Sequence, residues 1–153
     1  MDLILWRHAE AKDADEGQDD LSRALTSRGE KQAQRMAAWL DRHLPHATRV
    51  MTSPAVRCEQ TALALPHKYK VRPELAPGCS VDDLLKLAQW PDARGPVLVI
   101  GHQPVLGQTV ARLMGLPAGE CVVRRGAVWW LRSRERDGQG QTLVVTVQSP
   151  ELL

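Results

Sequence analysis

Four side chains that could do chemistry together, Arg7, His8, Arg57 and His102, follow short apolar runs of this sequence. Each run predicts a strand, and ligands of an open α/β sheet gather beyond the carboxyl ends of its strands. Two guanidinium groups hold a tetrahedral anion and stay charged at any working pH, whereas an imidazole with an ordinary pKa of about 6.5 can be a neutral nucleophile. If the strand ends converge, the pattern predicts transfer of a phosphoryl group to a histidine.

Phosphoryl transfer requires little beyond this set of residues. Its transition state spreads negative charge over the equatorial oxygens, so positioning and fixed positive charge supply most of the catalysis. The four residues need no metal ion, and we expect neither a metal nor another cofactor.

The elements that must position these residues follow from glycine, proline and alternating apolar runs, whose spacing is typical of an α/β domain. Strands are expected over residues 3–6, 49–52 and 97–100, with a carboxy-terminal hairpin of strands 122–131 and 142–148. Helices are expected over residues 28–43, from 53 onward, over 80–90 and over 103–114. A chain of 153 residues suits one domain and is too short for two, so we expect residues 1–153 to form a single unit.

The starts of two helices carry specific signals. Ser27 is expected to be the N-cap of the long first helix, with Glu30 as its capping-box partner. Ser53 is the expected N-cap of the second helix and Pro54 its first residue, which places Arg57 in the first turn. Free N–H groups at a helix start, joined by a guanidinium group, predict an anion site.

Composition and charge exclude several classes of protein. The net charge is only +2, and fifteen of the twenty basic residues are scattered arginines, which argues against nucleic-acid binding. Three widely spaced cysteines with no CxxC pattern indicate neither a disulfide framework nor a zinc site, and they suit a reducing cytoplasm. The first residues resemble neither a signal peptide nor a membrane span. We expect a cytoplasmic monomer, with the acidic stretch 12–20 as a solvated loop beside the pocket.

A series of short motifs resembles the histidine phosphatase superfamily, also called phosphoglycerate mutase-like, and within it the short SixA-type phosphohistidine phosphatases. The motifs are Arg7-His8 followed by a small residue, Leu25-Thr26 with Arg28-Gly29 and Gln32-Ala33, Ser53-Pro54 with Arg57 and Gln60-Thr61-Ala62, and Gly101-His102. They occur in the order of the family. The resemblance implies a three-layer α/β/α sandwich with a largely parallel central sheet, and a pocket at the carboxyl ends of the strands.

The resemblance also implies a role for each of the four residues. His8 would be the nucleophile that becomes transiently phosphorylated, and Arg7 and Arg57 would bind the phosphoryl oxygens. His102 would be the second pocket histidine, which donates a hydrogen bond to the phosphoryl group. Water would then hydrolyse the phosphohistidine.

The sequence departs from many relatives at two positions. Ala9 stands where many relatives have glycine, which requires a backbone conformation that an L-residue can adopt. Gln103 follows the second histidine, where acid phosphatase relatives carry an aspartate. The candidate proton donors are Glu10 and Glu59, of which we prefer Glu10 because it lies beside the nucleophile. A missing acid favours an N–P substrate, since an imidazole leaving group can be protonated before it departs.

The short chain lacks a sizeable insertion that could close over a small substrate. An open pocket favours a protruding phosphohistidine, and hence a histidine-phosphorylated signalling domain as the substrate. Two alternatives remain open at this point. One is a phosphatase or mutase for small phosphate monoesters, and the other is a non-catalytic module that binds phosphate or a phosphoprotein.

Overall fold

A six-stranded sheet forms the centre of the computed structural model, which describes all residues from 1 to 153. The strands are β1 (Asp2–Arg7), β2 (Arg49–Thr52), β3 (Tyr69–Val71), β4 (Val97–Gly101), β5 (Val128–Arg136) and β6 (Gln139–Gln148). They lie in the order β3-β2-β4-β1-β5-β6. The first four strands pair in parallel, and β5 and β6 add antiparallel pairs. The expected, largely parallel sheet is confirmed.

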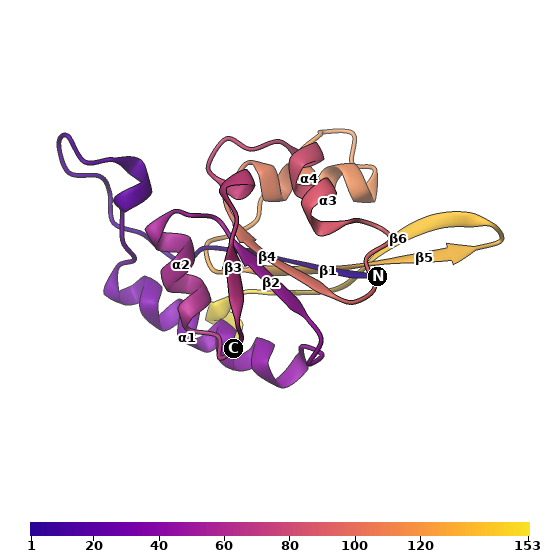
Figure 1. Ribbon diagram of the computed structural model, residues 1–153, viewed down its shortest axis with the longest axis horizontal. Coiled ribbons are helices and arrows are strands. Elements are labelled where there is room, and N and C mark those ends of the chain that lie inside the picture. The colour runs from indigo at the N-terminus through magenta and orange to yellow at the C-terminus, as the bar shows by residue number, and fades with distance from the viewer.

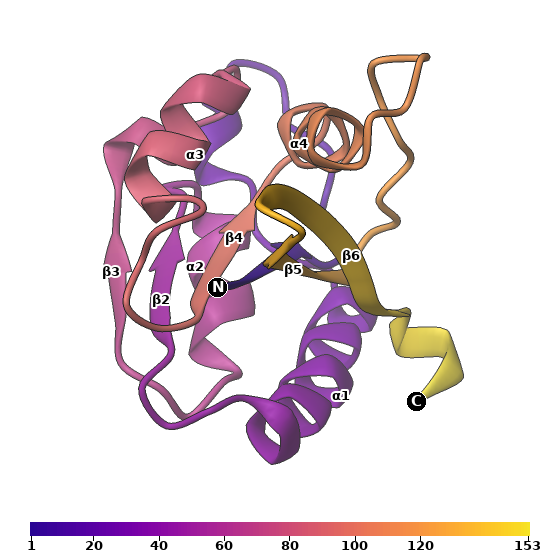
Figure 2. The same ribbon diagram turned by 90° about the vertical axis from the view of Figure 1, so that its right-hand side faces the viewer.

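Four α-helices cover the two faces of this sheet. They are α1 (Ser27–His43), α2 (Val56–Leu63), α3 (Val81–Ala88) and α4 (Val105–Met114), with short 3₁₀ turns at Asp20–Ser22, Pro73–Leu75 and Pro150–Leu152. Helices α1 and α2 lie on one face and α3 and α4 on the other (Figures 1 and 2). A separate cluster of fifteen buried residues lies between the sheet and each pair of helices, so the expected three layers are confirmed. No helix has the length and apolar character needed to cross a membrane.

The register of the parallel strands brings three chain segments to one edge. Arg7 of β1 pairs with Gly101 of β4, and Thr52 of β2 pairs with Ile100. Beyond the strands, the backbone N–H of His8 donates to the carbonyl of Gly101 at 3.2 Å, and that of Ser53 donates to Ile100 at 3.0 Å. The residues that follow β1, β2 and β4 therefore converge, as the sequence predicts.

Helix α1 begins one residue earlier than expected, and its N-cap is Thr26. The Thr26 hydroxyl accepts a hydrogen bond from the N–H of Gly29 at 2.9 Å, so the prediction of Ser27 as N-cap is wrong. The backbone N–H of Thr26 also donates to the carbonyl of Glu10, which ties this helix start to the segment after β1. A Cβ on Gly29 would lie 2.0 Å from that carbonyl oxygen, so the contact requires glycine.

Helix α2 begins at Val56, three residues beyond the predicted cap at Ser53. Its N-cap is Ala55, whose side chain forms no capping hydrogen bond. The Ser53 hydroxyl instead accepts from the N–H of Ala55 at 3.2 Å and contacts His102. A buried imidazole partner outweighs the local capping geometry here. Arg57 still falls in the first turn, as expected.

The carboxy-terminal hairpin is longer at its tip and shorter at its base than predicted. Asp137 and Gly138, with φ of 53° and 75°, form a two-residue turn of the kind that suits a hairpin. The hairpin extends beyond the helical layers (Figure 1). At its base, residues 122–127 form no strand because Gly126, with φ of 72°, turns the chain ahead of β5. Strand β3 was not among the predicted strands, because its three residues are too few to give an alternating apolar pattern.

Candidate active site

The four predicted residues line one cavity of about 200 Å³ beyond the ends of β1, β2 and β4. The cavity is lined by Arg7, His8, Ala11, Asp13, Arg23, Arg57, Pro77, His102, Gln103 and Arg125. The imidazole rings of His8 and His102 lie edge to face, with their centroids 5.3 Å apart. The side chains form no group of three or more His, Cys, Asp or Glu residues that could hold a metal ion. The cavity is thus an arginine-rich cup around two histidines.

His8 is held in one orientation and one tautomer. Its Nδ1 lies 2.7 Å from the carbonyl oxygen of Ala9. Because a carbonyl oxygen only accepts hydrogen bonds, Nδ1 carries the proton and Nε2 keeps its lone pair. The pKa of His8 is lowered to about 3, chiefly by burial. The hydrogen bond to Ala9 acts in the opposite direction, and the nearby charges of His102, Arg57 and Arg7 add to the lowering. At neutral pH, His8 therefore has a free nucleophilic nitrogen.

Ala9 replaces glycine without backbone strain. The residues other than glycine that have positive φ are Gln89 and Asp137, so Ala9 has an ordinary conformation. Its side chain is fully buried, and its N–H donates to the hydroxyl of Thr61 at 3.2 Å. Alanine at this position is compatible with the geometry of the cup.

His102 is buried between Ser53 and Arg57. Its Nε2 lies 2.7 Å from the Ser53 hydroxyl, and its Nδ1 lies 3.4 Å from Nη2 of Arg57. Burial and then the charge of Arg57 lower the pKa of His102 to about 4. The Cys58 thiol lies 3.5 Å from Nε2, but burial raises its pKa to about 12. His102 is therefore a neutral imidazole beside a thiol that stays protonated.

The two arginines predicted to bind phosphate, Arg7 and Arg57, each have a buried N–H group without a partner. Arg7 donates from Nη1 to the carbonyl of Val123 at 2.9 Å, while its Nε is buried and unpaired. Nε of Arg57 is likewise buried and unpaired. A buried guanidinium donor without an acceptor is costly. Both residues line the cavity, so an anion bound there would place acceptors beside their guanidinium groups.

Asp20 is a site residue that the sequence analysis missed. Nη1 of Arg57 donates to its backbone carbonyl at 2.8 Å and Nη2 to its carboxylate at 3.0 Å, and Arg23 bonds the second carboxylate oxygen at 2.9 Å. Burial raises the pKa of Asp20, but the hydrogen bonds from Arg57 and Arg23 outweigh it and hold the pKa below its ordinary value. Asp20 is therefore an ionised partner of Arg57.

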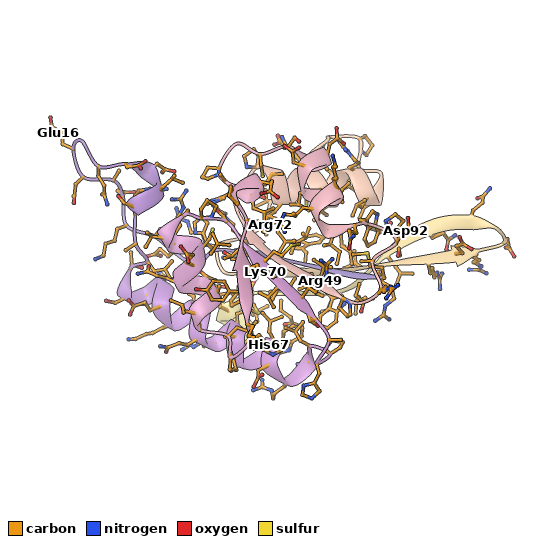
Figure 3. The ribbon with its side chains drawn as sticks, viewed as in Figure 1. Glu16, Arg49, His67, Lys70, Arg72 and Asp92 are labelled. Atoms are coloured by element: carbon orange, nitrogen blue, oxygen red, sulfur yellow. The ribbon has the colours of Figure 1, made fainter.

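The rest of the acidic loop behaves as expected. Glu16 lies at its outer tip, away from the body of the protein (Figure 3). Residues 12 to 17 are exposed, and among them Asp13 also lines the cavity. At the base of the loop, Asp20 accepts a hydrogen bond from Arg57. The loop is solvated and borders the pocket.

The structure does not bring Glu10 into the cup. Its carboxylate accepts a hydrogen bond from the Thr26 hydroxyl at 3.0 Å and lies 4.0 Å from Nε of Arg28, outside the cavity lining. Glu59 also lies outside this lining. The amide of Gln103 is engaged as well, because it donates to the carbonyl of Cys121 and accepts from an N–H of α4. Asp13 is the carboxylate that lines the cavity itself.

Comparison with known proteins gives consistent matches. The model of the histidine phosphatase superfamily (branch 1) matches residues 3–79. Phosphohistidine phosphatase SixA of Escherichia coli (strain K12) is 36% identical over 121 residues, which cover 74% of each chain. A SixA homolog of Haemophilus influenzae is 30% identical over 131 residues, covering 75% of this chain and 78% of that one. The structure of a protein histidine phosphatase SixA complexed with tungstate is 30% identical, with a TM-score of 0.74 and 99% of each chain covered.

Proposed function

This chain belongs to the histidine phosphatase superfamily, and we propose that it hydrolyses phosphoryl groups through a phosphohistidine formed on Nε2 of His8. The observation that carries the proposal is the fixed state of His8. Its Nδ1 is bonded to a carbonyl, its pKa is lowered to about 3, and it shares a cavity with Arg7 and Arg57. A neutral nucleophile beside fixed positive charge is what phosphoryl transfer requires.

The first step moves the phosphoryl group to the protein. Nε2 of His8 forms a bond to phosphorus while the bond to the leaving group breaks and its electron pair stays with the leaving atom. The guanidinium groups of Arg7 and Arg57, which line the cavity, provide donors for the phosphoryl oxygens, whose charge grows in the transition state. Nδ1 of His102 accepts from Arg57, because a guanidinium group only donates, so the ring proton lies on Nε2 toward the Ser53 hydroxyl. In this proposal His102 donates to the phosphoryl group from Nδ1 after that nitrogen takes up the ring's second proton.

The second step restores the protein. A water molecule attacks phosphorus and releases a proton, the bond from phosphorus to Nε2 breaks, and the electron pair returns to His8. Inorganic phosphate then leaves the cup. The chain's own residues supply the nucleophile and the positive charge for both steps, and we propose that no metal or other cofactor takes part.

The substrate in this proposal is a phosphohistidine on a protein. An imidazole leaving group can take its proton before departure, so it does not need a carboxylic acid held beside the bond. This fits a site in which Glu10 is bonded to Thr26 and Asp20 is ionised against Arg57. Relatives named phosphohistidine phosphatase SixA support the same choice.

A second candidate is a phosphatase for small phosphate esters. Asp13 favours it, because this carboxyl lines the cavity and could protonate an alkoxide leaving group. The Asp13→Asn variant distinguishes the two. It should lower turnover of an ester much more than turnover of a phosphohistidine if Asp13 is the acid.

The proposal extends to the working state of the protein. We propose a monomer, since Arg7, His8, Arg57 and His102 of a single chain already meet in one cavity. Three free cysteines suit a reducing cytoplasm, where the partner would be a histidine-phosphorylated domain. Gel filtration combined with light scattering measures the first point, and an oligomer whose dissociation abolishes activity would contradict it.

The test is phosphate release from a histidine-phosphorylated carrier protein in the presence of EDTA. We expect release by the wild type and none by His8→Ala, with full activity in His46→Ala, which changes an exposed histidine. Acid-labile labelling of the wild type alone would identify the intermediate. Full activity in His8→Ala would refute the nucleophile, activity confined to esters would favour the second candidate, and binding without release would indicate a binding module.

A further inference from the structure

The turn before β5 carries an arginine at the cavity whose charge has no partner. Arg125 lines the cup together with Arg7, His8, Arg57 and His102. It forms no ion pair, and its neighbour Arg124 forms none either. Burial and the positive charge of Arg125 together lower the pKa of Arg7. Arg7 and Arg125 are thus two like charges at one cavity, and neither forms an ion pair with a carboxylate.

The backbone fixes this turn to the strand that carries the nucleophile. The N–H of Gly126 donates to the carbonyl of His8 at 3.1 Å, and the indole of Trp6 donates to the carbonyl of Gly126 at 3.2 Å. The N–H of Arg7 donates to the carbonyl of Ala127 at 3.1 Å. The N–H of Ala127 donates to the carbonyl of residue 124 at 3.0 Å and closes the turn. Arg125 lies within this turn, directly before Gly126. Its Cα is therefore held in place relative to His8, although its side chain is exposed.

The segment before the turn is held by the cup itself. Nη1 of Arg7 donates to the carbonyl of Val123, which is fully buried, and the amide of Gln103 donates to the carbonyl of Cys121 at 3.0 Å. The cavity-lining residues and the turn thus form one hydrogen-bonded unit. A cation on such a unit is positioned before any ligand arrives, which lowers the entropic cost of binding.

The positive charge of Arg125 helps the cavity to match the negative charge of a phosphoryl group. Four arginines and the carboxylate of Asp13 line the cavity, and Asp20 bonds Arg57 from outside this lining. The excess is therefore two positive charges while both histidines are neutral. A phosphoryl group carries about 1.5 to 2 negative charges at neutral pH. Without Arg125 the excess would fall to one, because Asp20 already offsets the charge of Arg57.

We propose that Arg125 is a further phosphoryl-binding residue, whose guanidinium group binds the oxygen of the phosphoryl group that faces the cavity mouth. The inference rests on the proposed function only in taking the ligand of the cup to be a phosphoryl group. It adds a third arginine to Arg7 and Arg57. Arg125 makes up the positive charge that Asp20 removes, and it selects for the dianionic form of the ligand.

The experiment compares Arg125→Ala, Arg125→Lys and Arg124→Ala. Arg124 is the matched control because it is the adjacent exposed arginine of the same turn, lies outside the cavity lining, and changes the net charge equally. Calorimetry at one fixed salt concentration gives the dissociation constants of inorganic phosphate and tungstate. Steady-state kinetics on an aryl phosphate give KM and kcat, and circular dichroism confirms that each variant is folded.

Arg125→Ala should weaken phosphate binding by about tenfold, as expected for one charge-assisted hydrogen bond at a partly exposed site. KM should rise by a similar factor and kcat should change less, since ground state and transition state both use the contact. Arg125→Lys should recover part of the loss, and Arg124→Ala should bind phosphate within twofold of the wild type.

Two results would overturn the inference. One is phosphate binding by Arg125→Ala within twofold of the wild type, and the other is an equal loss in Arg124→Ala, which would indicate only long-range attraction. A wild type that binds neither anion would overturn it as well. A wild type that binds phosphate but turns over no substrate would refute the proposed hydrolysis and leave the role of Arg125 to be decided by the dissociation constants.

Discussion

Acid should destabilise this protein through its two buried histidines. Their pKa values in the folded state are about 3 for His8 and about 4 for His102, against an ordinary value of 6.5. As pH falls below 6.5, the unfolded chain takes up a proton at each histidine while the folded protein leaves both neutral. Stability rises with pH wherever the unfolded state binds more protons, so acidification must lower the free energy of unfolding.

The magnitude follows from the width of the pH window. Each pKa unit of difference corresponds to about 1.4 kcal/mol per histidine. Between pH 6.5 and pH 5, each histidine should therefore cost about 2 kcal/mol, and the pair about 4 kcal/mol. The loss should continue to about pH 4 for His102 and about pH 3 for His8. Both side chains are at least 91% buried, so solvent does little to screen the effect.

Urea unfolding at pH 7 and at pH 5 measures this loss. The wild type should lose about 4 kcal/mol more than a variant with both histidines replaced by alanine, and each single replacement should recover about half. His46→Ala serves as control because its histidine is exposed and its removal should leave the pH dependence unchanged. An equal slope in the wild type and the double variant would refute the buried neutral state on which the nucleophile assignment rests.

Three further predictions follow from single contacts of the site and its frame. Asp20→Ala leaves the buried Arg57 without its carboxylate, so kcat/KM on an aryl phosphate should fall by about tenfold, and Asp20→Asn should retain more because an acceptor remains. Ser53→Ala removes the contact to Nε2 of His102, and we expect a fall of about tenfold in kcat/KM in the same assay. Gly29→Ala would place a Cβ 2.0 Å from a backbone oxygen and should lower the free energy of unfolding by about 3 kcal/mol in urea.

Matched variants test these three predictions. Asp15→Ala removes an exposed carboxylate of the same loop and should leave kcat/KM unchanged. Gly140→Ala adds a Cβ with nothing within 4 Å and should change stability by less than about 0.5 kcal/mol. Wild-type kinetics in Ser53→Ala would mean that His102 needs no orienting partner, and a stable Gly29→Ala would mean that the segment after β1 can move away from α1.

The sequence is informative about the cup wherever function follows directly from a strand. Arg7 ends β1, His8 follows it, and His102 follows β4, so their convergence depends only on parallel strands ending at one edge of a sheet. Arg57 is fixed by the first turn of α2. Four residues could be assigned because apolar runs, glycine and proline locate the strand and helix boundaries that carry them.

The missed residues depend on contacts between distant segments. Asp20 and Arg57 are separated by 37 residues, and the loop containing Asp20 is otherwise exposed and acidic, so composition predicts solvent contact. Ser53 has the sequence pattern of an N-cap, but its hydroxyl bonds an imidazole 49 residues away. The sequence thus predicts solvent for Asp20 and a local contact for Ser53. The tertiary contacts form because the buried guanidinium of Arg57 and the buried imidazole of His102 must be paired.

Burial is the main cause of the neutrality of the two histidines, and the positive charges that would bind the phosphoryl group add to it. Arg57 and Arg7 contribute to the lowered pKa of His102 as long as the cup holds no anion, and they also attract the phosphoryl group. When that group binds, its negative charge offsets the arginines and must raise the pKa of His102. In the proposed reaction, the negative charge of the ligand then stabilises a proton added at Nδ1 of His102, which accepts from Arg57 in the empty cup. In the proposed reaction, substrate binding therefore strengthens the hydrogen-bond donor, while His8 keeps its lone pair through the bond from Nδ1 to Ala9.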